Sequence, residues 1–143
     1  MKLFVLLVFV SFTNVFYCQD SRDISNSSWK LESMTGFDSI SKEMTNRPNL
    51  KINVGPEGLL YLTGNDGCNR FHSKLKLNQS EFQIEDLVQT KRACINFTDV
   101  SAHYIKLLLE ASTYQIRDQH LLLVNSDRKT ILRFKKSNSS SKR

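Results

Sequence analysis

The segment LKINVGPEGLLYLT, residues 50–63, carries the pattern from which the fold is predicted. Apolar and polar residues alternate up to Val54, turn-forming residues occupy positions 55–58, and an apolar run resumes at Leu59. Alternation before a Gly-Pro turn and apolar residues after it are typical of two antiparallel strands joined as a hairpin. We therefore predict a β-hairpin at this point of the chain.

The same two-residue period continues on both sides of the hairpin. Further strands are predicted over residues 29–32, 71–77, 82–87, 114–116, 121–124 and 131–134. Short polar segments separate neighbouring strands, and such segments favour tight turns between antiparallel partners. The sequence therefore indicates an antiparallel sheet with mostly local connections.

One stretch has a longer period. Within residues 99–111 apolar residues recur every fourth position, in the rows Val100, Tyr104, Leu108 and Ile105, Leu109. This spacing predicts one amphipathic helix, with Thr98 or Asp99 as its N-cap. The expected fold class is α+β and rich in β-structure, a curved antiparallel sheet or a small barrel with one packed helix.

The two ends of the chain differ in composition from its middle. Residues 1–18 contain Lys2 followed by an eight-residue apolar run, a pattern typical of a secretory signal peptide. The run is too short to span a bilayer comfortably. Residues 19–27 are predicted to be a polar spacer, and residues 136–143 a disordered basic tail. This leaves residues 28–135 as a single exported domain.

Cys18 follows directly after the apolar segment. A cysteine in this place resembles a bacterial lipid-attachment site, although Tyr17 before it departs from that pattern. The alternative is that Cys18 belongs to the discarded leader and that the protein is freely secreted. The expected locations are therefore the periplasm, the outer membrane through a lipid on Cys18, or the medium.

The net charge of +6 is concentrated at the ends of the chain. Five of the 20 basic residues are end residues: Lys2, Lys135, Lys136, Lys142 and Arg143. Fifteen basic residues against 14 acidic ones leave residues 19–134 with a charge of +1. A basic stripe with interleaved aromatic residues is missing, so nucleic acid is not an expected partner.

Cys68 and Cys94 are predicted to form a disulfide, because two cysteines in a small exported domain usually pair; the alternative is two separate buried thiols. The three histidines His72, His103 and His120 are scattered, so neither a metal site nor a cofactor is predicted. A nucleophilic pair of Cys94 with His103, or of Cys68 with His72, would lack an orienting group.

Several short motifs together resemble one known family. They are Trp29-Lys30-Leu31, Asp66-Gly67-Cys68-Asn69-Arg70-Phe71 and Thr90-Lys91-Arg92-Ala93-Cys94, followed by a helix and three strands. In this order they resemble the META domain, the family of the bacterial heat-shock protein HslJ, over roughly residues 28–135. The resemblance implies a compact β-rich bacterial envelope domain without established catalysis. It also implies a structural role for the family-defining positions Gly67, Cys68, Asn69, Arg70, Thr90 and Cys94.

The leading functional hypothesis is thus an exported, non-catalytic, monomeric envelope domain with a link to stress tolerance or secretion. Its partner would be an unknown envelope protein or a small ligand, and it would meet a membrane only through Cys18. One alternative is a carrier that encloses an apolar ligand, which a core filled by side chains would exclude. The other is a cysteine-dependent enzyme.

Overall fold

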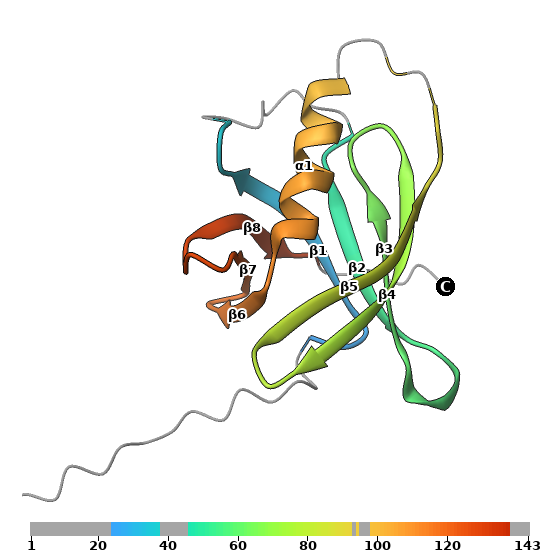
Figure 1. Cartoon of the computed structure of the whole chain (residues 1–143), viewed down its shortest axis with the longest axis vertical. Helices are drawn as coiled ribbons and strands as arrows, with labels where there is room; N and C mark the ends of the chain where they lie inside the picture. The colour runs from blue at the N-terminus through green and yellow to red at the C-terminus, as the bar shows by residue number, and fades with distance from the viewer. Residues whose placement is uncertain (1–23, 38–45, 93, 95–97, 138–143) are drawn as a thin grey trace, which may run out of the picture.

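The computed structural model describes residues 24–37, 46–92, 94 and 98–137, in which eight antiparallel strands form a closed ring with one helix (Figure 1). The strands are β1 (Ser27–Met34), β2 (Asn49–Val54), β3 (Leu60–Asn65), β4 (Arg70–Asn78), β5 (Glu81–Gln89), β6 (Thr113–Arg117), β7 (His120–Val124) and β8 (Thr130–Lys136). Each strand pairs with its neighbour in the chain, and β8 returns to pair with β1. The predicted fold class is confirmed, in its closed form.

The hairpin predicted from residues 50–63 is the pair β2 and β3. Ile52 lies opposite Leu62 in the register, and both side chains are fully buried. The connection contains a short 3-10 turn over Pro56–Gly58, with a hydrogen bond of 3.2 Å from the Leu59 amide to the Pro56 carbonyl. A second hydrogen bond, of 2.8 Å from the Gly55 amide to the Leu59 carbonyl, closes the hairpin loop around it. Alternation of apolar residues thus places one face of each strand inside the ring, as the pleat of a strand requires.

Side chains fill the inside of the ring. Trp29, Phe82, Leu108 and Leu123 are each at most 1% exposed and belong to one continuous hydrophobic cluster. These four residues come from β1, β5, the helix and β7, so the cluster draws on elements from the whole ring. A core filled by side chains in this way argues against a carrier that encloses an apolar ligand inside the ring.

The helix α1 (Thr98–Glu110) lies between the strands β3–β5 and the strands β6–β8 (Figure 1). Its buried apolar residues are Tyr104, Leu107 and Leu108, whereas Leu109, expected on an apolar row, is 53% exposed. The Tyr104 ring contacts both Phe71 of β4 and Phe134 of β8, at centroid distances of 6.1 and 6.2 Å. None of the helices in the described part of the chain has the length and apolar character needed to cross a membrane.

The joint between β5 and β6 is the least paired place in the ring. Its ladder has one register pair, Glu81 opposite Thr113, whereas β2 and β3 share six. Two backbone hydrogen bonds support it, from the Phe82 amide to the Ser112 carbonyl and from the Tyr114 amide to the Ser80 carbonyl. The joint involves the beginning of β5, whereas the chain leaves the sheet after Gln89, the other end of that strand, and passes through α1 before it returns as β6.

Both predicted ends of the domain need correction. Ile24, assigned to the polar spacer, is fully buried and belongs to the core cluster. Lys136, assigned to the disordered tail, is the last residue of β8, and its ammonium group lies 5.9 Å from the centre of the Trp29 ring. Composition alone missed both residues because their neighbours are polar. The predicted signal peptide and Cys18 lie outside the described residues.

Candidate functional site

The loop between β3 and β4, residues 65–70, is folded by its own polar side chains. The side-chain oxygen of Asn65 accepts a hydrogen bond of 2.6 Å from the Gly67 amide, and the Asp66 amide donates to the Asn69 carbonyl at 3.0 Å. Gly67 has a φ of 103°, in the region that favours glycine. Asn, Asp and Gly thus stand where a tight, partly left-handed turn needs them.

Asp66 is the charged residue at the centre of this loop and is fully buried. One carboxylate oxygen accepts hydrogen bonds from the amides of Cys68, at 2.8 Å, and Asn69, at 2.5 Å. The other oxygen accepts a hydrogen bond from the side-chain amide of Gln89. A buried carboxylate is tolerated when donors surround it in this way.

The pKa of Tyr104, a fully buried residue of α1, depends on its burial and on the charge of Asp66. Burial raises the pKa of the Tyr104 hydroxyl well above its ordinary value, and the negative charge of Asp66 raises it further. The phenol is therefore neutral at every physiological pH.

Asn69 and Thr90 connect the loop to the end of β5. The side-chain oxygen of Asn69 accepts hydrogen bonds from the Arg92 amide at 2.7 Å and from the Thr90 hydroxyl at 3.2 Å. The Thr90 hydroxyl in turn accepts from the Arg70 amide at 3.2 Å, and the Thr90 amide donates to the Arg70 carbonyl at 3.0 Å. The structure therefore brings together the motif positions Asn69, Arg70 and Thr90 that are separate in the sequence.

Cys68 and Cys94 form a disulfide, with Cα atoms 5.9 Å apart across a sequence separation of 26 residues. It connects the residue 65–70 loop to the segment that leads into α1. A cross-link closing a loop of this size stabilises a domain by about 3 to 4 kcal/mol in the chain-entropy model. Because both sulfur atoms are bonded to each other, neither is a free nucleophile for His72 or His103.

We call Asp66, Gly67, Cys68, Asn69, Gln89, Thr90 and Cys94, with their backbone contacts, the Asp66 brace. The sequence predicted its cysteines, Gly67, Asn69 and Thr90, but assigned no role to Asp66 or Gln89. The role of Asp66 could have been predicted, because an Asp directly before a Gly is typical of a turn in which the Asp side chain accepts hydrogen bonds from the backbone. Gln89 had none, since a polar residue at a strand end is usually solvated.

Little of the Asp66 brace is available for chemistry with a ligand. The side-chain oxygens of Asp66, Asn69 and Thr90 accept hydrogen bonds from the protein itself. Arg70 contributes its backbone to the contacts, and its side chain is exposed. Within the described ranges, no group of three or more potential metal-ligating His, Cys, Asp or Glu residues occurs. The arrangement is suited to holding the backbone in place.

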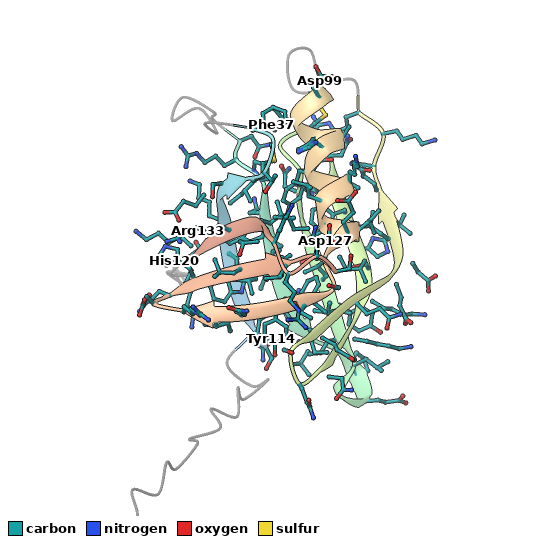
Figure 2. All side chains as sticks on the ribbon, turned by 60° about the vertical axis from the view of Figure 1, so that its left-hand side comes forward. Phe37, Asp99, Tyr114, His120, Asp127 and Arg133 are labelled. Atoms are coloured by element: carbon teal, nitrogen blue, oxygen red, sulfur yellow. A yellow bond between two sulfur atoms is a disulfide. The ribbon has the colours of Figure 1, made fainter. Side chains whose placement is uncertain are left out.

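A second polar cluster lies on β1, β7 and β8. Glu32 accepts a hydrogen bond of 2.6 Å from the Arg133 side chain, and the His120 ring nitrogen lies 3.4 Å from the same carboxylate oxygen. Figure 2 shows His120 and Arg133 beside each other on neighbouring strands. The hydrogen bond from Arg133 lowers the pKa of Glu32, against the opposing effect of burial. All three groups reach solvent, so this cluster is a polar network at the surface, with one ion pair between Glu32 and Arg133.

Comparisons with known proteins agree with the fold. A protein from Burkholderia xenovorans, solved by NMR, is 21% identical over 92% of this chain and 95% of its own, with a TM-score of 0.67. A DUF4847 family protein from Bacteroides vulgatus ATCC 8482 is 14% identical over 80% of this chain and 94% of its own, with a TM-score of 0.56. At these identities the likeness concerns the fold alone. A comparison with curated proteins gave no match.

A model of one family matches almost the whole described chain. The match is to the META domain and covers residues 22–138, which includes every residue of the Asp66 brace and the buried Ile24. The resemblance inferred from the sequence motifs is therefore confirmed. The chain belongs to the META domain family.

Proposed function

We propose that this protein is an exported, non-catalytic META domain of the bacterial cell envelope, in which the Asp66 brace has a structural role and binding takes place elsewhere on the surface. The observation that carries the proposal is the Cys68–Cys94 disulfide. Disulfides persist in oxidising compartments and are rare in the cytosol. The leader-like residues 1–18 support the same location.

The internal use of the motif side chains supports the absence of catalysis. A nucleophile or a general base needs an accessible, reactive group within reach of a substrate. Asp66 is buried under three hydrogen bonds, and Cys68 is 7% exposed and bonded to Cys94. These features favour a brace over an active site. A link to stress tolerance or secretion remains part of the proposal, by family likeness.

The test is the intact mass of the protein recovered from envelope, periplasm and medium fractions, with and without reductant. Removal of the leader, an increase of about 2 Da on reduction of the disulfide, and recovery outside the cytosol are expected. A lipid mass on Cys18 would assign the protein to a membrane, and its absence would assign it to free secretion. Recovery of the uncleaved, reduced chain in the cytosol would contradict the proposal.

The non-catalytic part is tested by alkylation of the native protein without reductant. Cys68 and Cys94 are expected to stay unmodified until reductant is added, because each is held in the disulfide. Rapid stoichiometric modification of either residue in the non-reduced native protein would favour the cysteine-dependent enzyme instead.

A further inference from the structure

Two adjoining hollows lie where β1 meets the beginning of β2 and the end of β8. Their volumes are about 370 and 230 Å³, and they share Lys30, Arg47 and Ser137 as lining residues. Together they are lined by five cations: Lys30, Arg47, Lys51, Lys135 and Lys136. Glu32 is the one acidic residue in their lining. We call the two hollows the basic groove.

The strand register explains why the cations gather here. Lys30 of β1 lies directly opposite Lys135 of β8, and Lys51 of β2 lies opposite Ser28. These three lysines alternate with buried apolar residues, so their side chains are on the outer face of the sheet. Closure of the ring thus brings Lys135 and Lys136, distant in sequence, next to the first strand. A sum of charges along the sequence does not reveal this patch, because Lys135 and Lys136 lie at the end of the chain and far from Lys30 in sequence.

Two lysines of the basic groove, Lys30 and Lys135, face each other as like charges, and neither forms an ion pair with another described residue. Like charges directly opposite each other on neighbouring strands destabilise a sheet, as Lys30 and Lys135 do. Ion pairs between described residues involve none of Lys30, Lys51, Lys135 and Lys136. Glu32, the nearby carboxylate, is hydrogen-bonded to Arg133 at 2.6 Å, and Lys135 acts on it only through a weaker electrostatic attraction. An anion in the groove would relieve this repulsion.

The remaining lining indicates what kind of anion fits. The side-chain amides of Asn46 and Asn49 donate to the Gly67 and Arg47 carbonyls at 3.1 and 3.3 Å. Their side-chain oxygens, together with the hydroxyl groups of Ser28 and Ser137, are the lining groups that suit hydroxyl groups of a ligand. The Trp29 ring, 1% exposed, offers no free face on which a nucleobase could stack. Lysine and arginine are the usual partners of phosphate. The larger hollow, of about 370 Å³, is in the size range of small-molecule sites, and the smaller one adjoins it.

From these observations we propose that the basic groove binds a phosphorylated saccharide, with Lys30 and Lys135 holding phosphate and the Asn and Ser side chains holding sugar hydroxyl groups. This is a binding site separate from the Asp66 brace. The proposed binding does not depend on where the protein is located, so its test is independent of the test for export.

The test is calorimetric titration of the full chain with glucose 1,6-bisphosphate, inorganic phosphate and glucose, together with sedimentation on phosphatidylglycerol vesicles. The test variant is Lys30→Gln/Lys135→Gln. The control is Lys106→Gln/Lys129→Gln, which removes the same charge from α1 and from the β7–β8 turn, where both lysines are exposed. Thermal unfolding of each variant without ligand is measured in parallel.

The bisphosphate is expected to bind more tightly than phosphate or glucose, and more weakly as salt is added. Lys30→Gln/Lys135→Gln should weaken its binding by about tenfold or more, since each lost charged hydrogen bond is costly, while the control keeps the affinity. The unliganded test variant should unfold at the same or a higher temperature, because repulsion is removed.

Three results would overturn the proposal. One is equal loss of affinity in both double variants, which would mean that net charge alone attracts the ligand. Another is equal affinity for inorganic phosphate and the bisphosphate, since nothing would then recognise the sugar. The third is binding to vesicles without binding to the bisphosphate, which would assign the patch to a lipid surface.

Discussion

Gln89, the last residue of β5, donates a hydrogen bond from its side-chain amide to the buried carboxylate of Asp66. This contact joins two segments 23 residues apart in sequence, and it completes a set of three donors around a charge that solvent does not reach. The stability of the Asp66 brace therefore depends on that carboxylate.

Replacing Asp66 by Ala is expected to lower the free energy of unfolding by about 3 kcal/mol, because three buried donors lose their acceptor. Asp66→Asn should cost less, since the amide oxygen still accepts from the two backbone amides. Urea unfolding followed by tryptophan fluorescence measures both. Asp127→Ala, in an exposed turn, is the control, and its effect should stay within about 0.5 kcal/mol.

Removal of the disulfide by Cys68→Ala/Cys94→Ala is expected to lower the free energy of unfolding by about 3 to 4 kcal/mol. Reductant should destabilise the natural chain by a comparable amount and leave the double variant unchanged. A double variant that is as stable as the oxidised chain would mean that the cross-link adds nothing to the Asp66 brace.

Asn69 and Arg70 are neighbours with different expected effects. Asn69→Ala removes the acceptor of the Arg92 amide and the Thr90 hydroxyl, so a loss of about 1 to 3 kcal/mol is expected. Arg70→Ala leaves the backbone contacts in place and should change stability by less than about 0.5 kcal/mol. Thermal unfolding of the two variants compares them directly. Equal losses would show that the Arg70 side chain also supports the loop.

The Glu32 cluster predicts a small pH dependence. The folded-state pKa of Glu32 is lowered from its ordinary value of 4.5, so its contribution is present above about that pH and is lost as the pH falls through the lower folded pKa. Because Glu32 is 42% exposed, solvent screening limits the contribution to less than about 1 kcal/mol. Unfolding of the natural chain and of Glu32→Gln between pH 2.5 and 7 should converge at the acid end. A constant difference over that range would contradict an ionic origin.

Much of the fold follows from local patterns. The hairpin of β2 and β3 could be predicted because alternation and a Gly-Pro turn are both contained in 14 residues. The closure of β8 on β1 could not, because the pairing of Leu31 with Phe134 depends on the accumulated twist and register of every strand between them. The burial of Ile24 was missed for the same reason, since what covers it comes from distant parts of the chain.

The candidate site was predictable to the extent that its residue types are diagnostic. Cys68 and Cys94 could be paired from composition and compartment, because disulfides follow redox conditions. Gln89 could not be identified, because its role arises from the position of β5 beside the β3–β4 loop. The basic groove was missed because Lys30 and Lys135 are 105 residues apart in sequence and meet only in the closed ring.

The disulfide has a further consequence for the way in which this domain is degraded. It encloses the whole β4–β5 hairpin in one covalent macrocycle, since β4 and β5 both lie between Cys68 and Cys94. A protease that nicks the turn between Asn78 and Glu81 would produce two fragments that stay linked through sulfur. The nicked protein would migrate as one species of full-length mass on a non-reducing gel, and it would separate into two fragments when a thiol is added.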